Sequence, residues 1–414
     1  MDYKRAYIEP LLATDVARQR DTLVKRYLYS LFFGMTLAAQ SGVAAAEVRS
    51  LDQTLSPYLS EFGLPALAAA VFKDGNIVAA GAVGTRRFGQ KIPVTIDDRF
   101  HLGSDSKAFT AVLLGQLIEA GQLKWDSTLG EIFPELKAQM DSDFAQITIE
   151  QLLSHTSGLS DKNIGDLLAG TYQQDGNMDE VRYWMLKETA GKPLDHPRGS
   201  KFDYCNLGYV FAGAVIERLT KQTWEEVAEQ RIFEPFGFIT AGFGPQSSIG
   251  KVDAPLGHQL VDAKPKGMLA GPNGDNPVIL GPAGTIHMSV IEFAKWVAWN
   301  AGEGKRPPQL VSAETLKKLH TPIVDTGVRN DAPPGTPKTG KYGLGWGQVK
   351  FDWAAEPVIT HTGSNQLNLA VAMFWPKTDF GYVMMANIAG TAGDAAMNKL
   401  AGQLYKECSG AGNE

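Results

Sequence analysis

The stretch from Lys107 to Ala120 constrains the fold more than any other part of the sequence. Its apolar residues are distributed all around a helix rather than along one face, and Gly121 follows as a natural stop. A helix that is apolar on every side has to be buried, so the rest of the chain must surround it. The helix nevertheless begins with a lysine, and burying an ammonium group is costly unless it is paired or loses its charge.

Strand patterns occur near both ends of the chain. The segment "LAAAVFKDGNIVAAGAVG" has Asp74-Gly75 between two apolar runs, which is typical of a β-hairpin. Near the C-terminus, "LNLAVAMFW", a turn at "PKTD" and "GYVMMAN" predict a second strand pair, and "DAAMNKLAGQLYKEC" predicts an amphipathic helix. We therefore expect a fold of α/β plus all-α type, in which both ends of the chain build one antiparallel sheet flanked by helices.

The middle of the chain is predicted to consist mostly of helices and loops. The segments "TIEQ" and "TWEE" have the spacing of helix capping boxes, and no strand pattern of comparable strength lies between them. The predicted division is an α/β domain from residues 47–124 and 265–414, and a mainly helical insertion domain from residues 125–264.

Two serines, Ser104 and Ser106, lie close to Lys107. Residues three apart on a helix share a face and neighbours do not, so Ser104 is the serine that pairs with the lysine. Serine is a poor nucleophile without a base, and lysine becomes a base only when burial lowers its pKa from about 10.4. Ser104 would also lie at a helix N-terminus, where free N–H groups favour developing negative charge. Ser104 is therefore the predicted nucleophile and Lys107 its predicted base.

The Ser-x-x-Lys spacing alone is weak evidence, because it also arises by chance. A second copy, Ser248-Ile-Gly-Lys251, is followed closely by Pro255 and has no helical pattern to carry it, so we interpret it as a loop. The structural alternative for Ser104 is a helix-capping serine beside a surface lysine.

Two further motifs favour the catalytic interpretation. The Tyr-Cys-Asn motif at residues 204–206 precedes a helical pattern, and it is the only Tyr-x-Asn among the twelve tyrosines. The His-Thr-Gly motif at residues 361–363 lies on a predicted strand. Serine with lysine, then Tyr-x-Asn, then Lys/His-Thr-Gly on a strand is, in this order, a three-part signature of acyl transfer to serine.

On these motifs the chain resembles the superfamily of serine β-lactamases and penicillin-binding proteins. It is most similar to the branch that holds class C β-lactamases, D-alanyl-D-alanine carboxypeptidases and β-lactamase-like esterases. The resemblance covers about residues 50–405 and includes "LLSHTSGL" and "YGLGWG". It implies a β-lactamase/transpeptidase-like fold, with an all-helical domain inserted in an α/β domain and the site at their junction.

The resemblance also implies a role for each motif residue. Ser104 would attack a carbonyl carbon and form an acyl-enzyme, Lys107 and Tyr204 would share the work of the base, and Tyr204 would return the proton to the leaving group. The supporting residues would be Asn206 (bonded to Lys107 and substrate), His361 (supporting Tyr204), Gly363 (third motif), Thr362 or Ser364 (holding a substrate carboxylate), and the backbone N–H groups of Ser104 and Ser364 (oxyanion hole).

Two positions depart from the family pattern. Cys205 stands where relatives commonly carry serine, which suggests a reactive thiol beside the site; a disulfide with the distant Cys408 is not expected. His361 replaces the lysine usual in class C β-lactamases, which favours peptidase or esterase activity over antibiotic hydrolysis. With an ordinary histidine pKa of about 6.5, His361 would also make activity depend on pH near neutrality.

A competing third motif occurs at Lys338-Thr-Gly340. It offers the lysine form, but it lies in a Pro/Gly-rich loop ahead of "YGLGWG", whereas the third motif of the family follows that segment on a strand. We therefore assign the third motif to His361.

The sequence thus predicts a serine hydrolase acting on a small-molecule or peptide substrate: a D-amino-acid peptide, or a small ester or amide. The alternatives are a class C-like β-lactamase and a non-catalytic penicillin-binding sensor or binding module. No cofactor is expected, and the histidines have no metal-ligand spacing. The formal net charge of −6 gives no basic surface for nucleic acid.

Residues 1–46 are predicted to be a signal peptide with an extended leader. Lys25 and Arg26 precede the apolar run "YLYSLFFGMTLAA", and an Ala-x-Ala end follows at Ala44 and Ala46. The run is shorter than the roughly 20 residues that span a bilayer. We therefore expect a periplasmic or secreted enzyme with no stable membrane span once the signal is removed.

Overall fold

The computed structural model describes residues 48–162, 164–271, 274–330, 332–333 and 335–410. The predicted signal peptide lies outside these residues. Among the described helices, none combines the length and the apolar character needed to cross a bilayer.

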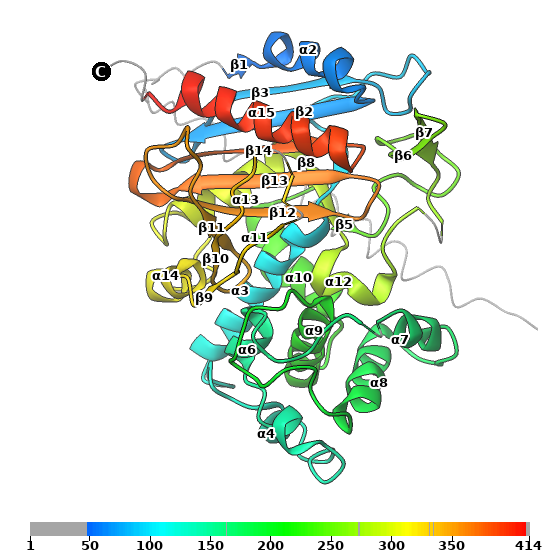
Figure 1. Ribbon diagram of the computed structural model, residues 1–414, viewed down its shortest axis with the longest axis vertical. Helices are drawn as coiled ribbons and strands as arrows, with labels where there is room; N and C mark the ends of the chain where they lie inside the picture. The colour runs from blue at the N-terminus through cyan, green and yellow to red at the C-terminus, as the bar shows by residue number, and fades with distance from the viewer. Residues whose placement is uncertain (1–47, 163, 272–273, 331, 334, 411–414) are drawn as a thin grey trace, which may run out of the picture. The chain divides into compact units, whose positions relative to one another are not determined.

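A nine-stranded sheet forms the centre of the α/β part (Figure 1). Its strands are β1 (Arg49–Ser50), β2 (Ala66–Lys73), β3 (Asn76–Gly84), β9 (Val324–Asp325), β10 (Lys341–Tyr342), β11 (Gly347–Val349), β12 (Val358–Ser364), β13 (Leu369–Trp375) and β14 (Phe380–Ala386). They lie in the order β1-β3-β2-β14-β13-β12-β11-β10-β9, and neighbours are antiparallel except β1 and β3. The hairpin at Asp74-Gly75 and the sheet built from both chain ends are confirmed, because β14 pairs directly with β2.

Helices cover both faces of this sheet, which explains why β13 and β14 are buried at every position. Alternate residues of a strand point to opposite faces. On β13, Ala370 and Ala372 belong to one apolar core, and Val371 and Met373 belong to the other. The helices of the second core are α2 (Asp52–Phe62) and α15 (Thr391–Cys408), and α15 lies across the near face in Figure 1; those of the first core include α3 (Ser106–Glu119) and α13 (Val290–Ala301).

Helix α3 is the buried central helix that the sequence predicts, starting one residue earlier than expected. Its residues from Ser106 to Gly115 are all buried, and so is Leu117. A 3₁₀ turn, Gly103–Asp105, precedes it, so Ser104 lies just before the α-helix rather than inside it. Lys107 therefore enters the core at the point where the turn becomes a helix.

The middle of the chain is mostly helical, and its helices α4, α6, α7, α8 and α9 lie below the sheet in Figure 1. Both predicted capping boxes form, with Thr148 and Thr223 as N-caps. These helices are α4 (Leu129–Ile132), α5 (Ser142–Ala145), α6 (Ile149–Leu153), α7 (Ile164–Thr171), α8 (Met178–Ala190), α9 (Asn206–Thr220), α10 (Trp224–Ala228), a π-helical segment (Glu229–Phe233) and α11 (Glu234–Phe236).

Shorter elements complete the described structure. They are β4 (Arg99–His101), β5 (Gly242–Phe243) and β8 (Ile286–Ser289) in one small sheet, the hairpin β6 (Gly257–Val261) and β7 (Lys264–Met268), and the helices α12 (Gly281–Gly284) and α14 (Ala313–His320). The predicted domain boundary after residue 264 falls within the β6–β7 hairpin.

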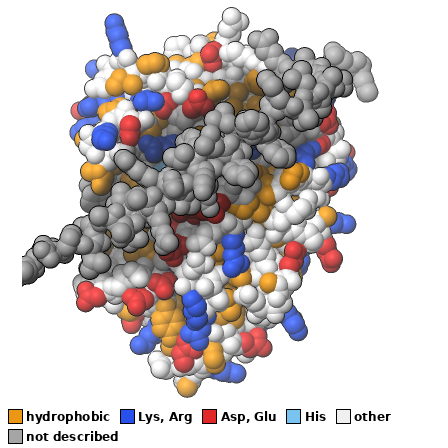
Figure 2. Space-filling view, turned by 180° about the vertical axis from the view of Figure 1, so that it is seen from behind, with side chains coloured by type: hydrophobic (Ala, Val, Ile, Leu, Met, Phe, Trp, Pro, Cys, Tyr) orange, Lys and Arg blue, Asp and Glu red, His pale blue; other side chains and the backbone are white. Residues whose placement is uncertain are grey.

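The charges on the described surface are mixed. On the face shown in Figure 2, lysine and arginine side chains are interspersed with aspartate and glutamate. This described part of the surface therefore presents alternating charge rather than a field of one sign.

Candidate active site

The structure brings the three sequence motifs to one cleft of about 740 Å³. Ser104 comes from the turn before α3, the residues Tyr204 and Asn206 from the start of α9, and the third motif from β12. The motif residues that line the cleft are Ser104, Tyr204, Asn206, His361, Thr362 and Ser364. The side chains of Thr362 and Ser364 are exposed to the cleft, whereas Lys107 lies behind its wall and is fully buried.

The amine of Lys107 has three neighbours at hydrogen-bond distance. Its Nζ lies 3.0 Å from Ser104 Oγ, 2.8 Å from Asn206 Oδ1 and 2.8 Å from the carbonyl oxygen of Ala283. A neutral amine can donate its two hydrogens to the two carbonyl oxygens, which leaves its lone pair directed at the Ser104 hydroxyl. The geometry therefore suits a lysine that accepts a proton from Ser104.

Burial makes this neutral form accessible. It lowers the pKa of Lys107 to about 7, although the nearby Asp161, Cys205 and Asp105 act in the opposite direction. Burial disfavours the charged form because the protein interior solvates an ammonium group poorly. A substantial fraction of Lys107 is therefore uncharged at neutral pH.

The hydroxyl group of Tyr204 also contacts the Ser104 side chain. The residue as a whole is 38% exposed, yet its hydroxyl end is packed inside the site, and burial raises the pKa of Tyr204 above its ordinary value. Lys107 Nζ lies 4.8 Å from the centre of this ring. Tyr204 is therefore a neutral phenol that can pass a proton, and Lys107 is the better base of the two.

Asp161, which the sequence analysis missed, fixes the start of α9. Its carboxylate accepts hydrogen bonds from the backbone N–H groups of Asn206 (2.9 Å) and Leu207 (3.1 Å), and from the side-chain amide of Asn206 (2.8 Å). Negative charge is favourable at a helix N-terminus. By holding the amide nitrogen of Asn206, Asp161 turns the amide oxygen of that residue toward Lys107.

The same carboxylate corrects the interpretation of Cys205. The thiol is buried and lies 3.3 Å from Asp161, and burial together with this negative charge raises its pKa well above the ordinary value. A reactive cysteine needs access and a lowered pKa. Cys205 has neither, so the suggested reactive thiol is wrong; both Cys205 and Cys408 are free.

His361 occupies the position of the third motif on β12. Its Nε2 lies 3.0 Å from the hydroxyl oxygen of Tyr342, and burial lowers its pKa to about 3, with a further contribution from Lys107. The expectation that His361 titrates near neutrality is therefore wrong, because the ring is enclosed. Lys338 is exposed on a loop and does not line the cleft.

The backbone of the turn and the backbone of β12 approach each other closely at two glycines. Gly103 has a φ of +52°, and a Cβ at Gly363 would lie 2.7 Å from the Ser104 amide nitrogen and would collide with the Leu102 carbonyl oxygen. Only glycine fits such a contact. The contact places the backbone amides of Ser104 and Ser364 on adjoining segments. Two N–H groups have to lie close together in this way if both are to donate to one oxyanion.

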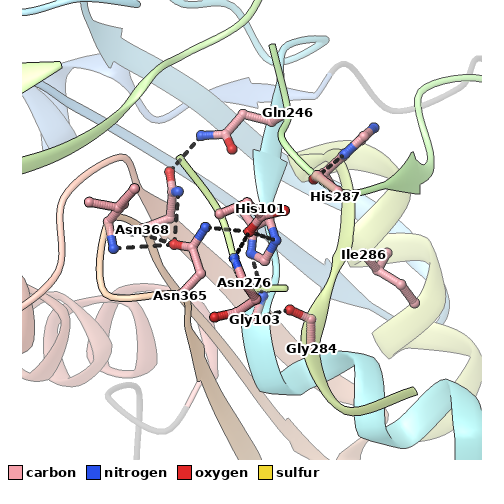
Figure 3. A network of polar contacts seen from close by, with 12 residues as sticks. His101, Gly103, Gln246, Asn276, Gly284, Ile286, His287, Asn365 and Asn368 are labelled. Carbon is pink, nitrogen blue, oxygen red and sulfur yellow. Dashed lines mark hydrogen bonds and ion pairs between the residues drawn. The ribbon is translucent and has the colours of Figure 1, made fainter. Parts of the chain in front are cut away.

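A buried polar network holds both segments from behind (Figure 3). His101 accepts a hydrogen bond from the Gly103 amide (2.9 Å), and its other nitrogen lies 2.8 Å from Asp275. The side chain of Asn365, the residue after Ser364, donates to the same carboxylate at 2.8 Å. One carboxylate therefore links the turn before the helix to the end of β12.

Ser106 faces away from the cleft and belongs to this support. Its hydroxyl donates to the Gly103 carbonyl oxygen (2.7 Å) and accepts from the Ile286 amide (3.1 Å). Ser248 and Lys251 lie in an exposed turn. No group of three or more histidine, cysteine, aspartate or glutamate side chains is arranged to hold a metal ion in the part of the chain that the structure describes.

Comparison with known proteins identifies several similar chains. Penicillin-binding protein 4 of Amycolatopsis lactamdurans is 28% identical over 315 residues, which cover 74% of this chain and 76% of that protein. Among solved structures, the octameric penicillin-binding protein homologue from Pyrococcus abyssi aligns with a TM-score of 0.67 at 22% identity, covering 86% of this chain and 76% of that one. The D-alanine carboxypeptidase AmpC from Burkholderia cenocepacia aligns with a TM-score of 0.63 at 21% identity, covering 85% and 97%. These two structures share the fold.

The family model described as Beta-lactamase matches residues 51–406, which is nearly all of the chain that the structure describes. The chain therefore belongs to the β-lactamase family, within the superfamily of serine β-lactamases and penicillin-binding proteins.

Proposed function

We propose that the chain is a serine hydrolase that cleaves a D-amino-acid peptide, or a small ester or amide, through an acyl-enzyme. The observation that carries the proposal is the geometry of Lys107, whose amine has two carbonyl acceptors and one remaining direction that faces Ser104. A helix-capping serine beside a surface lysine would have neither the burial nor these contacts.

The proposed reaction moves one proton in each half. Ser104 Oγ bonds to the substrate carbonyl carbon as its proton passes to Lys107, and the negative charge on the carbonyl oxygen is held by the N–H groups of Ser104 and Ser364. Tyr204 gives its proton to the leaving group and regains one from Lys107, so the acyl-enzyme forms with no net gain or loss of protons. In the second half, water bonds to the acyl carbon as its proton passes to the same base. The bond to Ser104 Oγ then breaks, Ser104 regains a proton, and the acyl group leaves as the acid.

The lining of the cleft bears on the substrate. Because His361 is neutral, a substrate carboxylate would find positive charge at Arg329 and Lys341, which line the same cleft, and hydroxyl groups at Thr362 and Ser364. A side cavity of about 200 Å³ shares part of this lining and is walled mainly by apolar residues, among them Phe351, Val371, Met373, Met384 and Met397. These features favour a peptide or ester that carries an apolar substituent.

A panel of three substrate classes tests the proposal. We expect the protein to hydrolyse p-nitrophenyl esters or D-alanyl-D-alanine peptides in steady state, and nitrocefin at least about tenfold more slowly, since the third motif carries no positive charge. A steady-state assay with mass spectrometry of the intact protein measures turnover and trapped acyl-enzyme together. Fast nitrocefin turnover would favour the β-lactamase, and a stoichiometric adduct without turnover would favour the sensor.

Substitution tests the assignment of the third motif. We expect His361→Ala to lower kcat on an ester by about 10²-fold, because the ring lines the cleft against Tyr342 and misplacement of a catalytic group by 1 Å costs about that much. Lys338→Ala is the control and should stay within about twofold, since exposed loop changes are usually small. Steady-state kinetics measures kcat, and circular dichroism checks that each variant is folded. If His361→Ala kept its kcat and Lys338→Ala lost it, the third motif would be at Lys338 instead.

A further inference from the structure

Asp105 is a buried acid that the proposed reaction does not use. It lies between Ser104 and Ser106 in the turn before α3, and its side chain is almost fully buried. Neither of its carboxyl oxygens has a hydrogen-bond partner among the described residues. Its ion-pair neighbour is Nδ1 of His361, at 3.9 Å, and this nitrogen is also without a hydrogen-bond partner. Two unsatisfied polar groups that face each other in a protein interior need an explanation.

The hydroxyl group of Tyr342 lies on the other side of His361. Its oxygen is 3.0 Å from Nε2 and can accept a hydrogen bond from an Nε2–H group. In that arrangement Nε2 of the imidazole carries the proton, and Nδ1 presents a lone pair to Asp105.

We propose that Asp105 is a positioning residue that acts as a carboxylic acid, donating a hydrogen bond to Nδ1 of His361 and so holding the neutral imidazole in one tautomer and orientation. An ionised carboxylate could not fill this role, because it has no hydrogen to offer to a lone pair. The separation of 3.9 Å is too long for a hydrogen bond. The two groups would close by about 1 Å when substrate binds, as hydrogen bonds in active sites often tighten only in the complex.

The protonated form of Asp105 also suits its other neighbour. Burial raises the pKa of Asp105 well above its ordinary value, against the attraction of Lys107. An ionised Asp105 raises the pKa of Lys107 and so favours the charged form of that amine. With the proton on Asp105, Lys107 is free to lose its own and accept the one from Ser104. The pair thus gives the third motif no net charge, where a lysine would give one positive charge.

Several titratable groups surround the pair, so a pH profile of activity would report the cluster rather than Asp105 alone. They are Lys107, His155, Asp161, Tyr204, Cys205, Tyr209 and Tyr342. Nitrogen NMR of the histidine rings observes the tautomer directly, and the signal missing from a His361→Gln variant identifies His361 among the seven histidines.

The test compares wild type with Asp105→Asn, whose amide can still donate to Nδ1, and Asp105→Leu, which cannot. We expect the wild type to show a neutral His361 with its proton on Nε2 at pH 7. Asp105→Leu should lose this single tautomer and lower kcat on p-nitrophenyl acetate by about 10²-fold, with KM within about twofold. Asp105→Asn should keep the tautomer and retain kcat within about tenfold. The exposed Asp97→Asn is the matched control and should match the wild type.

A wild-type His361 that is charged, or that carries its proton on Nδ1, would overturn the proposal, and so would an Asp105→Leu variant with full kcat. If Asp105→Leu does not fold, the wild-type and Asp105→Asn spectra decide. The proposal rests on the proposed function of this site, but the NMR measurement needs no turnover. A wild type that hydrolyses neither esters nor D-alanyl-D-alanine peptides would therefore refute the proposed function and leave this test in place.

Discussion

Replacing Ser104 with alanine is expected to lower the rate of ester hydrolysis by about 10⁴-fold or more and to abolish labelling by a fluorophosphonate probe. The hydroxyl is the atom that becomes acylated, and no other described serine lies against the amine of Lys107. Removing the nucleophile leaves only substrate binding and the oxyanion donors, which cannot form the covalent intermediate. Steady-state kinetics and peptide mapping of the labelled protein measure both effects.

The chain supplies a matched control in Ser248, the serine of the second Ser-x-x-Lys. It is exposed, and its hydroxyl donates a hydrogen bond to Asp253 at 2.6 Å rather than contacting a lysine. Ser248→Ala should keep rate and labelling within about twofold. A labelled peptide that maps to Ser248 or to another serine would show that the nucleophile has been misassigned.

Replacing Lys107 with methionine is expected to lower kcat/KM by about 10³-fold, in the range that a positioned base contributes. Methionine fills a similar volume without an amine, so Ser104 keeps its place but loses its proton acceptor. The thermal unfolding midpoint should stay the same or rise, because a buried amine is exchanged for an apolar group. Lys251→Met is the matched control and should leave kcat/KM unchanged.

The pH dependence of kcat/KM in the wild type is a second test of Lys107 as the base. Only neutral Lys107 can accept the proton, and burial lowers its pKa to about 7. The logarithm of kcat/KM should therefore rise with slope one below about pH 7 and level off above it. Lys107→Met should lose this dependence in whatever activity is left. A wild-type profile that stays flat from pH 5 to 9 would contradict the role of Lys107 as the base.

The local parts of this fold were predictable because their signals are short-range. The Asp74-Gly75 turn, the capping boxes at Thr148 and Thr223 and the all-apolar helix α3 each depend on neighbours within a few positions. The β6–β7 hairpin was missed because its strands are only half-buried and "KPKGM" has no alternating apolar pattern.

The support of the site was less predictable than its motifs. Spacing alone put Ser104 and Lys107 together, and a known order of motifs pointed to Tyr204 and His361. Asp161 has no comparable signal, because it meets Asn206 only through tertiary structure. The same limit applies to pKa values. A histidine on a strand looks ordinary in sequence, and only the enclosure around His361 shows that it stays neutral.

The place of β14 in the sheet has a consequence for how the chain folds. β14 lies between β2 and β13, and it pairs Phe380 with Lys73, residues from opposite ends of the chain. Such pairing gives a high contact order, so the sheet cannot close until almost all of the polypeptide has been synthesised. Until then the β2–β3 hairpin of the nascent chain presents an open edge that can pair with other chains. We therefore expect this half to fold after synthesis, and we expect a chain truncated before Phe380 to aggregate rather than fold.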